Sequence, residues 1–340
     1  MVNLIIDLSL HAPHLKYIIK DSLYYGEEKI YNFSSNHNNN EIISIYKFEL
    51  HEEKKKIMNH KTIDNFFFVF LTLSTEVQHQ GESAKKFYEM YKYIYNKFIP
   101  LVTGKIIIID NHGGDYEPSI YLNKFNFKYD IILKRIYSNR NKHRYLKNTF
   151  SYPFIMDTSN DPCYKLYNNN IIRSTNKINK IYFSGSLFDY HEEWDNHNTF
   201  EQADRKKIIN NFTGKYPNIL ELKRVPYNIF HETISKYKYA LDIRGTSRLN
   251  KRLYEILSTN TLLLAEKIDI VWPFEENDSF SEECFFEQGN ADDLYRIYNN
   301  FENNTELYKK CLENQMYIVK KYFNNEWIWN YIQKIIFKKL

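Results

Sequence analysis

YALDIRGTSRLNKRLYEILSTNTLLLAE, residues 239–266, carries the clearest structural signal in this chain. It predicts a buried strand at Tyr239–Ile243, a helix at Arg248–Leu257 and a second buried strand at Thr261–Ala265. Continuous apolar runs of this kind are typical of strands that are covered on both faces, as in a parallel sheet. Strand, helix and strand at these lengths indicate a βαβ unit, and therefore an α/β fold.

The turn between this strand and this helix is rich in groups that attract anions. Arg244 and Gly245 follow the strand directly, and Ser247 precedes the helix as its predicted N-cap. Free N–H groups at a helix start, the positive end of its dipole and the guanidinium groups of Arg244 and Arg248 together favour a bound anion. The turn is therefore a candidate phosphate site.

Further candidate donor-binding side chains extend this site. Arg252 and Glu255 come four and seven residues after Arg248, so all three share one helical face. A guanidinium binds phosphate through two parallel N–H bonds, and a carboxylate can accept bonds from ribose hydroxyls. We therefore expect a nucleoside diphosphate here. Ser184 and Gly185, which follow another predicted strand, either line the same phosphates or form a plain turn.

The alternation of strands and helices continues along the chain and predicts two Rossmann-like, doubly wound domains that face each other across a cleft. The expected domains are residues 1–155, residues 175–322 and a C-terminal helix, 323–340, that packs back toward the first domain. Strands are expected at Leu4–Leu10, Ile42–Leu50, Asn65–Leu73, Lys105–Ile109, Asp130–Leu133, Lys180–Phe183 and Asn218–Leu222. Helices are expected at Ser83–Phe98, Glu201–Phe212, Tyr227–Tyr237, Ala291–Asn299, Leu307–Tyr322 and Asn325–Phe337.

Composition narrows the functional class. The 340 residues include 46 Lys and Arg against 42 Asp and Glu, a net charge of +4, and a dedicated nucleic-acid binder usually has a stronger basic signal. The three cysteines are far apart, which disfavours a disulfide framework. No apolar run reaches the roughly 18 residues that a membrane span needs, and the N-terminus lacks a basic region typical of signal peptides. We expect a soluble, cytoplasmic enzyme with no transmembrane segment and no nucleic-acid partner.

The donor motif resembles that of GT-B glycosyltransferases, especially the CAP10-like and exostosin-like families. Arg244-Gly245, Ser247, Arg248, Arg252, Glu255 and the strand Thr261–Ala265 occupy the positions of that motif. A weaker similarity extends upstream to Lys105–Asp110, Ile131–Arg135 and Tyr152–Phe154. The resemblance implies a GT-B fold and an inverting transfer of a sugar from a nucleotide-diphosphate donor to a hydroxyl on a glycan or glycoprotein. It also implies that neither a metal nor a further cofactor is required.

Candidate catalytic residues follow from the need for a base that takes the proton of the acceptor hydroxyl. Asp110, His112 and Asp115 lie just after a strand of the N-terminal half, where the resemblance places that base, although a carboxylate in such a turn can equally stabilise the turn itself. Lys134 and Arg135 are candidates for contact with phosphate or acceptor. Weaker cleft candidates are Glu76 and His79. The acidic and histidine-rich residues of Asp189–His197 lack ligand spacing and are interpreted as a solvated loop.

Two other classes of function stay open at this point. One is a sugar-nucleotide epimerase or a related isomerase on the same folds, and the other is a non-catalytic carbohydrate- or protein-binding module on a GT-B scaffold. A dinucleotide-dependent oxidoreductase and a P-loop NTPase are disfavoured, because the sequence contains neither G-x-G-x-x-G after a predicted strand nor G-x-x-x-x-G-K-[ST].

Overall fold

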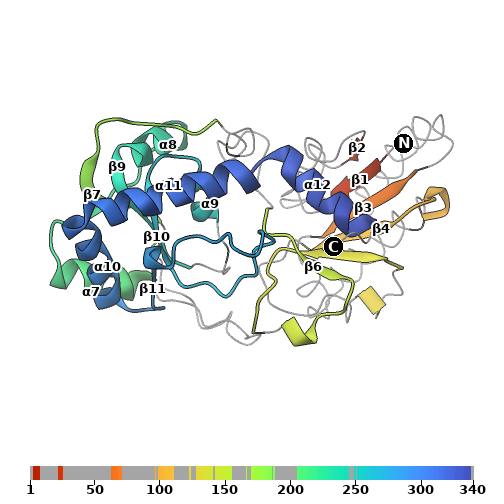
Figure 1. Ribbon diagram of the computed structural model, residues 1–340, viewed down its shortest axis with the longest axis horizontal. Helices are drawn as coiled ribbons and strands as arrows, with labels where there is room; N and C mark the ends of the chain where they lie inside the picture. The colour runs from red at the N-terminus through yellow and green to blue at the C-terminus, as the bar shows by residue number, and fades with distance from the viewer. Residues whose placement is uncertain are drawn as a thin grey trace, which may run out of the picture. The chain divides into compact units, whose positions relative to one another are not determined.

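The computed structural model describes residues 3–7, 22–25, 63–70, 96, 99–110, 122–123, 128–140, 142–154, 166, 170–185, 187, 205–244, 249 and 251–337. The chain divides into two compact units, which are described separately. Unit 1 comprises Met1–Ser159 together with Trp329–Leu340, and unit 2 comprises Asn160–Ile328. Each unit contains one parallel sheet, so the α/β class predicted from the sequence is confirmed (Figure 1).

Unit 1 contains a six-stranded sheet in the order β2-β1-β3-β4-β5-β6, with every neighbouring pair parallel. Four of its strands were predicted from their apolar runs, whereas β2 and β6 were missed because four and three residues give too short a pattern. The predicted strand Ile42–Leu50 lies outside the described residues, as does nearly all of the predicted helix Ser83–Phe98. The strands are β1 (Asn3–Asp7), β2 (Ser22–Tyr25), β3 (Asn65–Phe70), β4 (Ile106–Asp110), β5 (Ile131–Lys134) and β6 (Thr149–Ser151).

The core of unit 1 lies along the central strands. Ile107–Ile109 and Ile131–Leu133 are buried at every position, as expected for strands that are covered on both faces. The last helix, α12 (Asn325–Ile336), contributes its C-terminal part to this unit. There the hydroxyl of Tyr331 donates a 2.7 Å hydrogen bond to the carbonyl of Ser151 in β6, and burial raises the pKa of this tyrosine.

Unit 2 contains a five-stranded parallel sheet in the order β11-β10-β9-β7-β8. Numbered within the unit, this is the order 2-1-3-4-5 of a doubly wound sheet. The strands are β7 (Ile178–Phe183), β8 (Leu220–Leu222), β9 (Tyr237–Asp242), β10 (Leu262–Glu266) and β11 (Phe285–Phe286). The helices of unit 2 are α7 (Arg205–Lys215), α8 (Tyr227–Ser235), α9 (Lys251–Leu257), α10 (Ala291–Asn303) and α11 (Thr305–Tyr322), together with the 3-10 turn η5 (Glu282–Cys284). The 3-10 turns η2 (Ile99–Leu101) and η3 (Lys142–Arg144) belong to unit 1.

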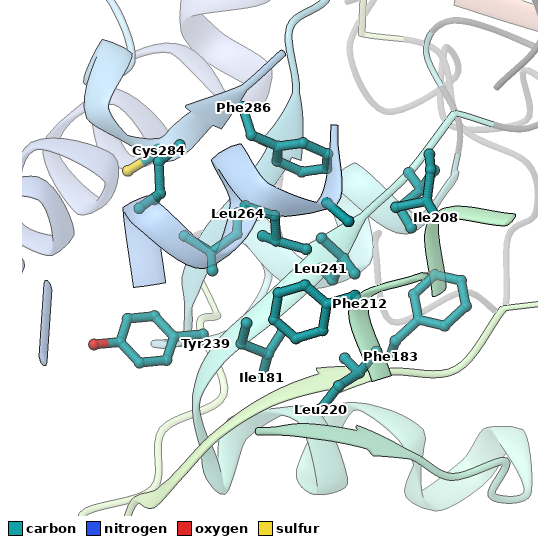
Figure 2. Packing of buried hydrophobic residues seen from close by; sticks show 14 of the residues in the cluster. Ile181, Phe183, Ile208, Phe212, Leu220, Tyr239, Leu241, Leu264, Cys284 and Phe286 are labelled. Atoms are coloured by element: carbon teal, nitrogen blue, oxygen red, sulfur yellow. The ribbon is translucent and has the colours of Figure 1, made fainter. Parts of the chain in front are cut away.

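Helices cover both faces of this second sheet. One face buries alternate strand residues such as Ile181, Leu241 and Leu264 against α7 and α10, and Figure 2 shows Phe212 of α7 within this cluster. The other face packs on α8 and α9, where the rings of Tyr182 and Phe230 lie 6.3 Å apart. Successive side chains point to opposite faces of strands that are buried on both sides, such as β9 and β10, and this allows two layers of helices.

Three predicted boundaries in unit 2 were wrong for identifiable reasons. The helix expected at Tyr227–Tyr237 ends at Ser235, because Tyr237 already pairs with Ile178 as part of β9. The sequence did not predict this strand start because the charged residue Lys238 interrupts the apolar run. In the structure Nζ of Lys238 lies 2.7 Å from the carboxylate of Glu302, which neutralises its charge. β8 begins at Leu220 rather than Asn218, because Asn218 has a φ of 70° and so occupies a turn conformation.

Gln315 of α11 satisfies backbone groups at the start of β10. Its side-chain amide accepts a 2.9 Å bond from the N–H of Leu263 and donates a 2.9 Å bond to the carbonyl of Thr261. On the side of β10 that faces away from β9, β11 pairs only with Ala265 and Glu266. The backbone groups of the earlier residues of β10 therefore need another partner on that side. Within the residues described, no helix combines the length and apolar character that crossing a membrane requires.

Replacing Gln315 with alanine is expected to destabilise the chain by about 2 kcal/mol or more, because two buried backbone groups lose their partners. Urea denaturation followed by circular dichroism measures this change. Glu313→Ala, an exposed position on the same helix, is the control and is expected to cost less than about 0.5 kcal/mol. Equal effects of the two substitutions would contradict the role assigned to Gln315.

Candidate functional site

The sheet of unit 2 reverses its winding direction between β7 and β9, which are neighbours although β8 separates them in the sequence. In open α/β sheets ligands bind beyond the carboxyl ends of the strands at such a switch point. Ser184 and Gly185 directly follow β7, and Arg244 is the second residue after the end of β9. The structure thus brings these predicted donor residues to the two strand ends that flank the switch point.

Gly185 lies directly against the ring of Phe183. A Cβ atom at Gly185 would lie 2.3 Å from Cζ of that ring, so any other residue at this position would require the ring to move. The same ring lies 6.0 Å from the guanidinium of Arg252 on α9. The ring of Phe183 therefore lies close both to the turn after β7 and to the cation that was predicted to bind the donor.

Arg244 is held by a buried carboxylate at the end of the neighbouring strand. Oε2 of Glu266 accepts bonds from the backbone N–H of Arg244 at 3.0 Å and from its Nε at 3.4 Å. The other oxygen accepts a 3.0 Å bond from the N–H of Gly289. Arg244 is 7% exposed and Glu266 1% exposed, so each charge compensates the desolvation of the other.

Arg205, the first residue of α7, was not predicted as a site residue. Its Nε donates to the carbonyls of Ile243 and Arg244 at 3.1 and 2.7 Å. Burial lowers the pKa of its guanidinium, and the nearby charges of Asp242 and Glu266 partly oppose that shift. Sequence reasoning assigned this arginine to a helix and could not see that the helix begins beside the end of β9.

Arg252 and Glu255 lie side by side on α9, as their spacing predicted. The guanidinium Nε of Arg252 lies 3.0 Å from the carboxylate of Glu255. Glu255 is buried, with 4% of its surface exposed. The guanidinium also lies 4.8 Å from the ring centroid of Phe230, and Nζ of Lys251 lies 4.8 Å from that of Tyr227. These cation–π contacts fix both basic side chains against α8.

The charged side chains at these strand ends and on α9 comprise three arginines and three carboxylates, so their charges nearly cancel. A bound diphosphate would therefore need further positive groups, and Lys251 and the predicted Arg248 are the nearest in sequence. Gly245, Ser247 and Arg248 lie outside the described residues, so their part in the site stays a prediction. The balanced set comprises Arg205, Arg244 and Arg252 against Asp242, Glu255 and Glu266.

In unit 1 the predicted catalytic residue Asp110 pairs with the predicted phosphate or acceptor contact Lys134. The two residues are register partners at the carboxyl ends of β4 and β5, and Nζ of Lys134 lies 3.0 Å from Oδ2 of Asp110. Both side chains are fully buried. The backbone N–H of Arg135 also donates to the carbonyl of Asp110 at 3.0 Å. Two candidates that were given separate roles therefore form one internal ion pair.

The remaining candidates fall on parts of the chain that the structure does not describe. These are His112, Asp115, Glu76, His79 and the loop Asp189–His197. Among the described residues, no group of three or more His, Cys, Asp or Glu side chains is arranged to hold a metal ion.

Neither the family models nor the curated protein sequences contain a match to this chain. Solved structures do resemble it over nearly the whole length. An alpha-glucosyltransferase in complex with UDP and a DNA 13-mer containing an HMU base has 11% identity and a TM-score of 0.51, with 99% of both chains covered. A glycosyltransferase from Rickettsia africae has 14% identity and a TM-score of 0.49 over 99% of this chain and 90% of its own. The T4 phage BGT in complex with UDP-glucose has 14% identity and a TM-score of 0.46, with 99% of both covered.

These findings define the class of fold. The chain has the two-unit parallel α/β architecture of GT-B glycosyltransferases, and the alpha-glucosyltransferase is the solved structure on which this fold assignment rests. The narrower resemblance to CAP10-like and exostosin-like families stays a prediction, because no family model matches.

The buried pair of Asp110 and Lys134 yields a test in which an exposed pair is the control. Lys134→Met leaves a buried carboxylate without its cation and is expected to cost about 3–5 kcal/mol. Lys105→Met removes the 3.4 Å pair with Asp130 between the same two strands, where both side chains are 38% exposed, and is expected to cost under about 1 kcal/mol.

The double variant Asp110→Leu/Lys134→Met is expected to be more stable than Lys134→Met alone, because no unpaired charge remains. Chemical denaturation measures these three variants together with the single variant Asp110→Leu, which completes the cycle. A double variant whose cost equals the sum of the single costs would mean that the pair does not act as a unit.

Proposed function

We propose that this chain is a glycosyltransferase that moves a sugar from a nucleotide-diphosphate donor to a hydroxyl acceptor, with inversion at the anomeric carbon. The observation that carries the proposal is the position of Ser184, Gly185 and Arg244 at the β7/β9 switch point of unit 2, with Arg252 and Glu255 beside them. The UDP and UDP-glucose in the similar solved structures support a donor of this class.

Each side chain of unit 2 has a role that suits its chemistry. Glu255 accepts hydrogen bonds from the ribose hydroxyls, while Arg252 and Arg248 bind the diphosphate through their N–H groups. Glu266 orients Arg244 through its backbone and side chain, so that Arg244 keeps its position when the donor is absent. These roles are proposals that combine the described geometry with the family resemblance.

The chemistry is a single displacement. The acceptor oxygen forms a bond to the anomeric carbon as the bond from that carbon to the β-phosphate oxygen breaks. The electron pair leaves with the nucleoside diphosphate, whose developing charge the arginines stabilise. A base takes the proton of the acceptor hydroxyl. Because positive side chains can stabilise the leaving group, we propose that the transfer needs no metal ion.

We assign the base to Asp115 or His112 in preference to Asp110. A base must reach the acceptor hydroxyl, and the carboxylate of Asp110 is fully buried on Lys134. Asp110 and Lys134 are then positioning residues that hold the strand ends from which the catalytic turn departs. The family resemblance implies a glycan or glycoprotein acceptor, and the alpha-glucosyltransferase structure contains DNA beside UDP.

Donor binding is tested by a thermal-shift screen of the full chain against nucleoside diphosphates and their sugars, with NAD as the control ligand. One nucleoside diphosphate is expected to raise the melting temperature by several degrees at about a hundredfold excess over its dissociation constant. Arg248→Ala is expected to abolish that ligand-induced shift. Arg244 and Arg252 are poor test positions, because removal of either leaves a buried carboxylate, Glu266 or Glu255, without its cation.

The matched control is Arg296→Ala, which removes an exposed arginine from α10 and is expected to keep the full shift. No shift with any nucleotide would favour the non-catalytic binding module. A shift without sugar transfer, but with interconversion of the bound sugar, would favour the epimerase.

The base assignment is tested by turnover. Asp115→Asn and His112→Ala are both compared with the parent chain for release of nucleoside diphosphate, and one of them is expected to lose about 100-fold or more in kcat while donor binding is kept. Unchanged kcat in both variants would contradict this assignment.

A further inference from the structure

Two of the three cysteines of the chain lie together in unit 2. Cys284 ends the 3-10 turn η5, directly before β11, and Cys311 lies in the second turn of α11. Both are free thiols, they are hydrogen-bonded to each other, and they are 5% and 2% exposed. Figure 2 shows Cys284 in the hydrophobic cluster to which both residues belong. Two thiols that are far apart in the sequence thus form a contacting pair in the core of this unit.

Asn314 holds the turn of Cys284 against the helix of Cys311. Its side-chain Nδ2 donates to the carbonyl of Ser279 at 2.9 Å and to Oγ of Ser281 at 3.0 Å. Ser281 precedes η5 as its N-cap residue, and its carbonyl accepts a 3.1 Å bond from the N–H of Cys284. Asn314 comes three residues after Cys311, so the two share one face of α11. Hydrogen bonds therefore fix the position of one thiol relative to the other.

The surroundings make the two thiols unequal. A hydrogen bond from the Cys284 thiol lowers the pKa of Cys311 to about 7, burial opposes this shift, and a bond from the Ser281 hydroxyl adds to it. The bond with Cys311 and burial raise the pKa of Cys284. Oγ of Ser281 accepts its bond from Asn314, so its hydrogen is available to donate to Cys311. Cys311 is therefore the thiol that ionises first, and the thiolate is the nucleophilic form of cysteine.

The pair lies beside the edge of the described sheet. β11 is the last strand on that side and pairs with β10 only at Ala265 and Glu266. Glu283 and Lys310, which precede the two cysteines in the sequence, are both exposed. An edge strand that two residue pairs hold opens at a small fraction of the free energy of global unfolding, and such opening brings a small reagent to the sulfurs.

We propose that Cys284 and Cys311 are a site of oxidative modification, at which a small peroxide converts the two thiols into an intramolecular disulfide. With hydrogen peroxide, the Cys311 thiolate attacks one oxygen, the O–O bond breaks, and the departing hydroxide takes a proton from solvent to form water. The sulfur of Cys284 then attacks the sulfenic acid on Cys311 and the S–O bond breaks. The departing hydroxide takes the Cys284 proton as a second water. One peroxide is thus reduced by the two electrons that the two thiols lose.

The disulfide ties the edge strand β11 to α11. Because a cross-link restricts the unfolded chain, the oxidised protein is expected to be more stable than the reduced one. β11 also borders Glu266 of β10, whose carboxylate binds Arg244, so the stabilised region includes the support of the candidate donor site. The modification itself uses no residue to which we assign a role in sugar transfer, and it goes beyond that proposed function.

The pair is tested on the full chain by treatment with hydrogen peroxide, followed by alkylation of the remaining thiols and mass spectrometry of the peptides. A cross-linked peptide pair that contains Cys284 and Cys311 is expected. The melting temperature is expected to rise by about 5 °C or more, and dithiothreitol is expected to reverse the rise. Cys163→Ser, at the third cysteine of the chain, is the control and is expected to keep both the cross-link and the rise.

The inequality of the thiols is tested with single variants at the same peroxide concentration. Cys284→Ser is expected to leave a sulfenic acid on Cys311, which dimedone traps, whereas Cys311→Ser is expected to leave Cys284 unmodified. Two thiols that remain open to alkylation after peroxide treatment of the parent chain would overturn the proposal. A cross-link to Cys163, or sulfinic acids without any cross-link, would overturn it as well. These measurements involve no nucleotide, so the thermal-shift screen decides the transferase proposal separately.

Discussion

Every neighbouring strand pair in both described sheets is parallel, and this constraint decides where polar chemistry can collect. Each parallel pair needs a crossover that returns the chain, so the carboxyl ends of all strands lie along one edge. The strand interiors are apolar because helices cover the sheets. Charged side chains therefore appear where the strands end, as Asp110 and Lys134 do in unit 1 and Glu266 does in unit 2.

Buried charge at these edges is used to fix backbone position. The carboxylate of Glu266 binds the N–H groups of Arg244 and Gly289, so one side chain joins the end of β9 to the turn before α10. Arg205 binds two carbonyls at the same strand end. Such interactions contribute little net stability, since desolvation offsets the attraction, but they specify one geometry strongly. A strand end whose position is fixed beside the switch point suits a donor site of the proposed kind.

Sequence reasoning found the elements with strong local patterns and missed those that depend on distant partners. The isoleucine runs of β4 and β5 were sufficient to predict buried strands, and the sequence also placed Ser184 and Arg244 just after two strands. Only the strand order of the structure shows that these two strands are neighbours at the switch point. The bond from Arg244 to Glu266 spans 22 residues and that from Arg205 to Ile243 spans 38, so no local pattern reveals either.

A crystal structure of the full chain with the nucleoside diphosphate that gives the largest thermal shift would show where the donor binds. The proposed site predicts the diphosphate at the turn between β9 and α9 and the ribose hydroxyls within hydrogen-bond distance of the Glu255 carboxylate. Nucleotide bound away from the carboxyl ends of β7 and β9, with Arg252 and Glu255 contacting only each other, would contradict the assignment of unit 2 as the donor-binding unit.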